Sequence, residues 1–171
     1  MIKYTGIKGV LIVNEDESIN GVVEDCLLNI KLLKVCSLLI TINGIISSCA
    51  LIPFWKIKSF GEKIMFTGEI IAVKRDEIDG AEHSAAGNYF GKEIVYPTNE
   101  KIGDLVDVII EEETGRIRAI VVSRGFVDDV VDGRRVVIID EKTVFEKDKI
   151  IVQESETNIV NEILLKRLLR G

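Results

Sequence analysis

Several residue types on which common active sites depend are scarce in this sequence. Its 171 residues include one histidine, three cysteines, two prolines and 14 glycines. The single histidine, His83, argues against a histidine-based catalytic triad and a multi-histidine metal site. Three cysteines without a CxxC pair are not typical of a disulfide framework or a zinc site. They lie in apolar runs, where buried reduced thiols are expected: Cys26, Cys36 and Cys49.

Other absences narrow the function further. The sequence has no glycine-rich phosphate-binding motif, so no nucleotide cofactor is expected. No cationic segment followed by an apolar run and a cleavage site opens it, and we therefore expect a cytoplasmic protein. The formal net charge is −6, with an isoelectric point near 5.0. An acidic chain of this kind is not expected to bind nucleic acid directly.

The chain reads as two apolar-rich units separated by a polar segment. The acidic excess lies in the second half, and a change in composition of this kind is typical of a domain boundary. The polar, glycine-containing stretch 74–88 favours a linker. We predict a first domain over 1–70, a linker over 71–89, a second domain over 90–153 and a C-terminal helix over 154–171.

The two units resemble each other at an offset of 82 residues. Gly9–Val13 then falls on Gly91–Val95, and Gly21 falls on Gly103 without a gap. The offset lengthens by about four residues within the loop 125–135. A repeat of this kind indicates an internal duplication.

Each unit consists of short Val- and Ile-rich runs separated by turn residues, which predicts β-strands. Asn43-Gly44 is a hairpin signal because a type I′ turn needs two positive φ angles. Glu113-Thr114-Gly115 occupies the corresponding position in the second unit. The predicted strands are Val10–Val13, Val22–Leu28, Val35–Ile42, Ile45–Ile52, Ile64–Phe66, Glu93–Tyr96, Leu105–Glu111, Arg116–Ser123, Arg135–Ile139 and Lys149–Val152.

Two segments raise the question of a membrane. Val35–Trp55 contains no charged residue, but turn residues and Pro53 interrupt it, which favours two buried strands. The tail has Ser155 as a candidate N-cap, apolar residues at helical spacing and basic residues in its last turn. It predicts an amphipathic helix that covers a barrel face or mediates dimerisation, with a membrane anchor as the alternative.

The carboxylates do not form a recognisable catalytic or metal-binding pattern. Asp25 and Asp107 are equivalent in the repeat, and a role as acceptors of backbone N–H bonds at a strand end is the simplest interpretation. The acidic loop with Asp128, Asp129 and Asp132 lacks a calcium-binding register, although a weak cation site stays open. We therefore predict no enzyme, no cofactor and no dedicated metal site.

The best binding candidates are large apolar residues beside charged ones. Phe54 and Trp55 follow Pro53 and precede lysines, and Phe126 and Val127 lie among acidic residues. Aromatic residues in such settings often anchor protein interfaces. These four residues form the predicted binding site, although burial in the core is an alternative for each.

The second unit resembles the PRC-barrel family. The resemblance rests on Gly91–Val95, a short polar turn, the glycine-led run Lys101–Ile110, and the hairpin into a third strand at Thr114–Ile117. It covers roughly Phe90–Val152. Ile7–Phe66 resembles a more divergent copy of the same pattern.

The resemblance implies two tandem, small, highly curved PRC-barrel-like β-barrels in an all-β protein. Similar domains occur in the photosynthetic reaction-centre H subunit and in a ribosome maturation factor that engages a small-subunit protein. Short stand-alone versions occur in spore-forming bacteria. The expected function is that of a non-catalytic bacterial adaptor that docks a protein partner.

Two alternatives stay open within that expectation. The first is a ribosome maturation or RNA-processing accessory factor, which would contact a ribosomal protein rather than bare RNA. The second is a membrane-associated protein held by the C-terminal helix. A homodimer is compatible with each of them.

Overall fold

The computed structural model describes residues 1–16, 20–42, 49–78, 83–154 and 159–161, and most of its regular structure is β-strand. The predicted all-β fold is confirmed. The chain divides into two compact units, one made of Met1–Asn88 with Ile110–Arg116, the other of Tyr89–Ile109 with Ile117–Gly171. Each unit has its own sheet.

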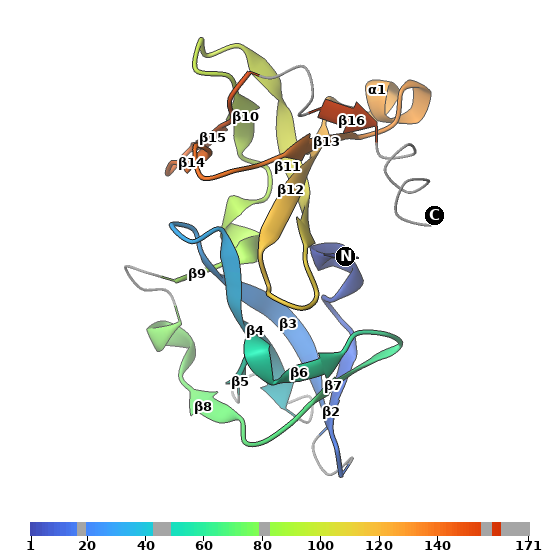
Figure 1. Ribbon diagram of the computed structural model, residues 1–171, viewed down its shortest axis with the longest axis vertical. Helices are drawn as coiled ribbons and strands as arrows, with labels where there is room; N and C mark the ends of the chain where they lie inside the picture. The colour runs from blue at the N-terminus through green and yellow to red at the C-terminus, as the bar shows by residue number, and fades with distance from the viewer. Residues whose placement is uncertain (17–19, 43–48, 79–82, 155–158, 162–171) are drawn as a thin grey trace. The chain divides into compact units, whose positions relative to one another are not determined.

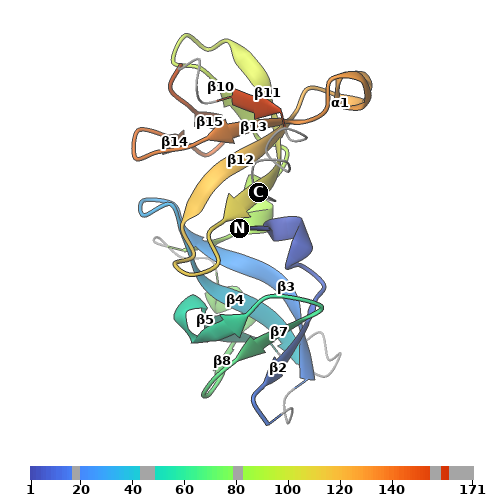
Figure 2. The same ribbon diagram turned by 45° about the vertical axis from the view of Figure 1, so that its right-hand side comes forward.

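A long antiparallel hairpin forms the centre of the first sheet. β3 (Asn20–Asn29) pairs with β4 (Lys34–Ile42), and both are visibly bent in Figures 1 and 2. The strand order is β6-β7-β2-β3-β4-β5-β8. β2 and β7 are parallel, whereas the other neighbours are antiparallel. The remaining elements are β1 (Ile2–Lys3), η1 (Tyr4–Gly6), β2 (Leu11–Asn14), β5 (Cys49–Pro53), η2 (Phe54–Lys56), β6 (Ile57–Ser59), β7 (Lys63–Phe66), β8 (Ile71–Val73), η3 (Arg75–Glu77) and β9 (Ser84–Ala85).

The second sheet has the same plan. Its strand order is β14-β15-β10-β11-β12-β13-β16, and its β10 and β15 are parallel like β2 and β7. The elements of this part of the chain are η4 (Ala86–Tyr89), β10 (Glu93–Val95), β11 (Lys101–Ile110), β12 (Ile117–Ser123), α1 (Phe126–Val131), β13 (Arg135–Ile138), β14 (Val144–Phe145), β15 (Lys149–Ile151) and β16 (Ile159–Asn161).

Individual backbone contacts repeat at the offset of 82 residues. The N–H of Gly9 donates to the carbonyl of Val23 at 2.8 Å, and the N–H of Gly91 donates to the carbonyl of Leu105 at 2.8 Å. Both glycines have a left-handed backbone conformation, with φ of 82° and 81°. The repeat at this offset, noted in the sequence, is therefore also seen in the backbone contacts of the two units.

The longer offset near the end of each unit is also present. In the parallel pairs, Ile12 lies opposite Ile64 and Ile94 lies opposite Ile150. The first members of these pairs are 82 residues apart and the second members 86. The four extra residues are inserted before β15, where the second unit also contains α1.

Each sheet buries its own apolar core. Alternating strand residues supply it, because successive side chains of a strand point to opposite faces. In the second unit, Ile109, Ala119, Val121 and Val136 form one buried cluster, with Val106 packed against it. The largest fully buried side chains are Phe66, Ile7, Ile12, Leu28, Leu38, Ile40, Ile52, Ile64, Ile94, Leu105, Ile110 and Ile120.

The ten predicted strands correspond to β2, β3, β4, β5, β7, β10, β11, β12, β13 and β15. Six strands of two or three residues were not predicted, because so short a run holds little periodic pattern. They are β1, β6, β8, β9, β14 and β16. Among the described residues no pairing joins the end strands β6 and β8, or β14 and β16, so these sheets are open and curved rather than closed barrels.

The structure differs from the sequence analysis in the linker and the tail. Within 71–89, expected as a linker, β8 pairs with β5 and β9 pairs with β3. The helix predicted over 154–171 is wrong at Ile159–Asn161, which form β16 beside β13. Tertiary pairing overrides helical spacing at these three residues. The rest of the predicted helix, from residue 155 to 158 and from 162 to 171, lies outside the described residues.

Both predicted hairpins join antiparallel strands. β4 pairs with β5 from Thr41 opposite Cys49 onward, although the turn Asn43-Gly44 itself lies outside the described residues. At the second hairpin, the N–H of Gly115 donates to the carbonyl of Glu111 at 2.9 Å. Gly115 has φ of 74°, a value that glycine adopts without strain.

Across the described residues, no helix combines the length and apolar character needed to cross a bilayer. The uncharged stretch Val35–Trp55 forms β4, β5 and part of η2, apart from residues 43–48, which are not described.

We predict that Gly103→Ala destabilises the protein more than its repeat equivalent Gly21→Ala. A Cβ at Gly103 would lie 2.3 Å from the carbonyl oxygen of Ser123, whereas one at Gly21 would lie 3.2 Å from that of Thr41. Overpacking of this kind costs about 1–3 kcal/mol or more. Denaturant unfolding of both variants measures the difference. Equal losses would contradict the tighter packing of the second hairpin.

Candidate functional site

The turn that follows β5 presents two neighbouring aromatic residues in opposite directions. Pro53 ends β5 with φ of −54°, and the single 3₁₀ turn η2 follows directly. Phe54 is buried at 4% exposure, whereas Trp55 is 77% exposed. Phe54 packs against Phe60, with ring centroids 5.7 Å apart. Of the predicted binding residues, Trp55 is thus at the surface and Phe54 supports it from the core side.

A groove of about 470 Å³ opens beside this turn. Its lining combines an aromatic wall with residues of the β3–β4 and β11–β12 hairpins, all within the first unit. Leu32 adds a second large exposed apolar side chain at 63% exposure. The lining residues are Leu32, Lys34, Val35, Cys36, Phe54, Trp55, Glu113 and Thr114. Exposed apolar side chains at the edge of a groove are typical of a protein-binding site.

Gly115 brings the β11–β12 turn into this groove. The N–H of Val35 donates to the carbonyl of Gly115 at 2.8 Å. The backbones of Lys34 and Arg116 also pair there in a single antiparallel β-bridge. A Cβ at position 115 would lie 2.8 Å from the carbonyl oxygen of Val35 and 2.9 Å from Cδ1 of Phe54. Only glycine allows this approach, which places Glu113 and Thr114 in the groove wall.

Trp55 is held in place by its neighbour Lys56. The ammonium nitrogen of Lys56 lies 5.5 Å from the centroid of the Trp55 ring, within the range of a cation–π contact. The same Nζ donates to the carbonyl oxygen of Glu69 at 2.7 Å, and the N–H of Thr67 donates to the Lys56 carbonyl at 3.0 Å. This contact, worth about 0.5–1 kcal/mol at an exposed site, favours the observed orientation of the indole.

The second predicted cluster is α1 in the second unit, where the sequence suggested a loop. Phe126 and Val127 are 85% and 72% exposed, and Val130 and Val131 are also exposed. Asp129 holds the helix to β12, because its carboxylate accepts the Ser123 hydroxyl at 2.8 Å. The described structure brings these residues together in one helix, but it does not join them to the groove beside Trp55.

Hydrogen bonds hold Asp129 in its ionised form. Burial raises its pKa, but the hydrogen bonds from Ser123, from the N–H of Arg124 and from Arg134 lower it by more. The carboxylate thus serves the local structure, and no group of three or more metal-ligating side chains exists among the described residues.

The repeat-equivalent aspartates also have local partners. Asp25 accepts the N–H of Cys26 at 2.7 Å and that of Gly87 at 3.3 Å, and Asp107 accepts the N–H of Val108 at 2.9 Å. They bind backbone N–H groups as predicted, but from inside β3 and β11 rather than at strand ends. Burial, followed by the charge of Asp25, raises the pKa of Cys26 well above its usual range, which makes this thiol a poor nucleophile.

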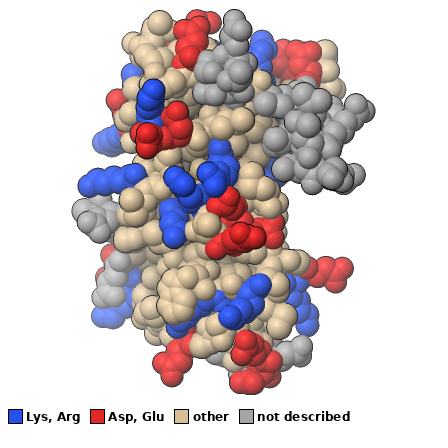
Figure 3. Space-filling view, viewed as in Figure 1, with Lys and Arg blue, Asp and Glu red and all other residues tan. Residues whose placement is uncertain are grey.

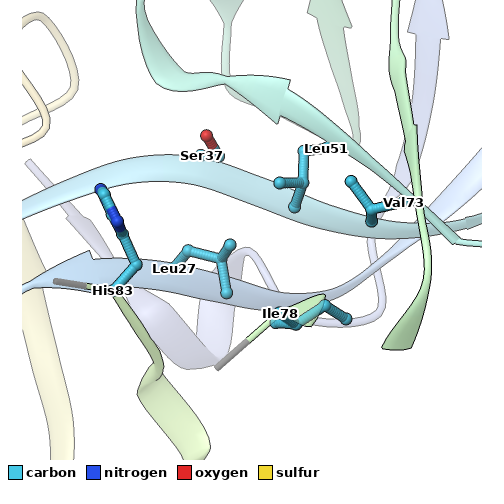
Figure 4. Close-up of a pocket in the computed structure, with 6 residues that line it drawn as sticks. All are labelled: Leu27, Ser37, Leu51, Val73, Ile78 and His83. Carbon is cyan, nitrogen blue, oxygen red and sulfur yellow. The ribbon is translucent and has the colours of Figure 1, made fainter. Parts of the chain in front are cut away.

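His83 lines a smaller pocket of about 230 Å³ in the first unit. It faces the same hollow as Ser37, with apolar residues forming the remaining wall (Figure 4). His83 is half-buried, although it belongs to the polar stretch 74–88 that the sequence predicted to be a linker. The apolar lining consists of Leu27, Leu51, Val73 and Ile78.

Comparison with known families supports the resemblance found in the second unit. Residues 82–159 match the PRC-barrel domain model. This PRC-barrel match covers just under half of the chain, includes β9 to β15 and α1, and ends at the first residue of β16. A search of curated proteins finds no significant match. The groove beside Trp55 belongs mostly to residues outside the PRC-barrel match, and only its Glu113 and Thr114 lie inside it.

The sequence did not indicate that Leu32 lines the groove or that Gly115 shapes it. Leu32 follows a strand, and its N–H donates to the Asn29 side chain at 3.1 Å within the β3–β4 turn. An apolar residue in a turn was the available signal for Leu32. The role of Gly115 depends on a contact with Phe54, sixty-one positions away in sequence, for which no local signal exists.

We predict that Gly115→Ala disturbs the groove, with Gly91→Ala as the matched control. Both glycines have similar left-handed φ values, 74° and 81°, but a Cβ at Gly91 has nothing within 4 Å. The conformational cost, about 1 kcal/mol, is shared, whereas the clash with Phe54 adds about 1–3 kcal/mol at Gly115 alone. Denaturant unfolding and Trp55 fluorescence measure this. A change in Trp55 emission in both variants, or in neither, would contradict the contact.

We also predict an acid-sensitive contribution from Glu24. A side-chain hydrogen bond from Arg75 lowers the pKa of Glu24, with N–O distances of 2.5 and 2.7 Å, and the Thr41 hydroxyl donates to it at 2.7 Å. Because the folded pKa is lowered, the stabilisation is present above the ordinary carboxyl value and lost as pH falls through the folded pKa.

Glu24→Gln should therefore reduce the loss of stability on acidification below the ordinary carboxyl pKa. Unfolding free energy measured against pH tests this, with Glu62→Gln at an exposed turn as the control. If both variants keep the wild-type acid profile, the ion pair contributes nothing to it.

Proposed function

We propose that the protein is a non-catalytic binding module whose first unit docks a protein partner in the groove beside Trp55. The observation that carries the proposal is an indole that is 77% exposed and yet held by Lys56 at the edge of a groove of about 470 Å³. Leu32 is also exposed and lines the same groove, and adjoining exposed apolar residues of this kind mark interaction sites. Trp is also among the residues that most often dominate the binding energy of an interface.

The chemistry of the groove favours a polypeptide segment with an apolar side chain. Leu32, Trp55 and the ring of Phe54 offer apolar contact, whereas Lys34 and Glu113 offer one charge of each sign at the border. This combination of an apolar centre and a polar rim matches the usual anatomy of a protein interface. Acidic and basic side chains both occur on the face seen in Figure 3, and neither sign covers it alone. An extended basic surface for nucleic acid would look different.

The proposal treats the first unit as a second, divergent copy of the PRC-barrel fold. Its support is the identical strand order of the two sheets and the repeated glycine contacts, Gly9 to Val23 and Gly91 to Leu105. On this view the duplication supplied a second copy whose β5–η2 turn acquired the binding residues. A cytoplasmic, non-enzymatic adaptor remains part of the proposal, and the absence of a metal-ligating cluster among the described residues is compatible with it.

The test uses the fact that Trp55 is the single tryptophan of the chain. Tagged wild-type protein, Trp55→Ala and the control Met65→Ala, which alters another exposed apolar residue of the first unit, are used for affinity capture from cells of the native host. A partner retained by wild type and Met65→Ala but lost with Trp55→Ala is then purified. It should change the emission of Trp55 on binding.

The expected effect of Trp55→Ala is a loss of affinity by a factor of about 30 or more, as for other aromatic interface anchors. Equal affinity of all three proteins for every captured partner would contradict the proposal. Turnover of a substrate by the purified chain would contradict its non-catalytic part.

A further inference from the structure

The pocket that His83 lines lies over one face of the first sheet. Ser37 is directly opposite Leu27 in the pairing of β3 with β4, so their side chains are on the same face. The registers of β4 with β5 and of β5 with β8 place Leu51 and Val73 on that face too, because residues an even number apart along a strand point the same way. Four neighbouring strands therefore form the floor of this pocket.

Two residues from outside these four strands complete the described lining, Ile78 and His83. Ile78 ends the 3₁₀ turn η3, and its N–H donates to the carbonyl of Arg75 at 3.3 Å. The guanidinium of Arg75 pairs with both carboxylate oxygens of Glu24 on β3, at 2.5 and 2.7 Å. His83 directly precedes β9, which pairs with β3. An ion pair and a strand pairing thus hold the segments that carry the two residues.

The apolar and polar side chains occupy different parts of the pocket. In Figure 4, Leu51, Val73 and Ile78 gather at one end. His83 lies at the opposite end, and the neighbours Leu27 and Ser37 lie between. A mostly apolar pocket with a small number of polar groups is the usual form of a small-molecule site.

The size and charge of the pocket restrict its ligand. Its volume is about 230 Å³. This is below the roughly 300 Å³ at which pockets for drug-sized molecules begin and above the roughly 150 Å³ of a cavity that holds benzene. A single ring with one or two substituents fits that range. The described lining contains no Lys, Arg, Asp or Glu, so a charged ligand would lose its water without gaining an oppositely charged partner from these residue types.

We propose that this pocket binds a small uncharged ring compound that carries a hydroxyl group, as in a phenol. The ring packs against Leu51, Val73 and Ile78, and the hydroxyl hydrogen-bonds to His83 beside Ser37. A hydroxyl group suits this end because it both donates and accepts, as a neutral imidazole does. The pocket shares no described lining residue with the groove beside Trp55, so this inference does not depend on the proposed function.

NMR titration of the ¹⁵N-labelled full chain tests the proposal with three probes. p-Cresol has the ring and the hydroxyl, toluene lacks the hydroxyl, and benzoate carries a charge. p-Cresol should shift the amide signals of the lining residues with a Kd of about 1 mM or tighter. Toluene should bind there about fivefold more weakly, because it lacks the hydrogen bond. Benzoate should not saturate these shifts.

Two variants test the two ends of the pocket. Val73→Phe places a ring in the apolar end and should weaken p-cresol binding at least about tenfold. Val22→Phe makes the same change at an exposed valine of β3 and should leave the affinity unchanged. His83→Ala should reduce the affinity for p-cresol to that for toluene and leave toluene binding unchanged. If Val73→Phe fails to fold, as its NMR spectrum would show, His83→Ala is the variant that decides.

Three outcomes overturn the proposal. The first is no saturable shift of the lining amides at about 10 mM p-cresol. The second is benzoate bound as tightly as p-cresol, or p-cresol bound as tightly by His83→Ala as by wild type. The third is p-cresol binding that disappears with Trp55→Ala, since the ring would then occupy the groove of the proposed function.

Discussion

The close approach of Gly115 to Phe54 is the contact on which the candidate binding site depends. It leaves no room for a side chain at position 115, where a Cβ would lie 2.9 Å from the ring of Phe54. Because the turn can come this near, Glu113 and Thr114 line the same groove as Phe54 and Trp55 of η2. Phe54 thus has two functions: its ring is part of the core, and its position fixes where the next residue, Trp55, emerges.

The two units show how one strand plan can carry different surface features. Strand order, the parallel pair and the left-handed glycine before it are the same in both sheets. The differences lie in the connections. After β5 the first unit has the short η2 with its exposed indole, and after β12 the second unit has α1 with an exposed apolar face. Loops tolerate insertions because they contribute little to the core, so functional residues gather there.

Several features of the fold followed from local sequence pattern. Runs of valine and isoleucine predicted all of the longer strands, and the repeat predicted a shared plan for the two sheets. Glycine at position 115 marked a hairpin because its positive φ suits a tight turn. Six of the strands of two or three residues were not predicted, since pairing with a neighbouring strand decides whether so short a run becomes a strand. For the same reason the helix predicted at Ile159–Asn161 is wrong. Helix propensity is a weak preference, and at these three residues the hydrogen-bonded pairing with β13 outweighs it.

The sequence by itself determined the fold class, the repeated strand pattern of the two units and the residue types available for binding. It could not decide which of two adjacent aromatic residues faces outward, because Phe54 and Trp55 are both large and apolar and no periodic pattern separates them. That choice was made by the tertiary structure, where Phe60 and Gly115 occupy the space around Phe54 and leave Trp55 over Lys56 at the surface. The exposed apolar face of α1 has a similar origin: Ser123 and Arg134 hydrogen-bond to Asp129, and this six-residue helix leaves Phe126, Val127, Val130 and Val131 exposed.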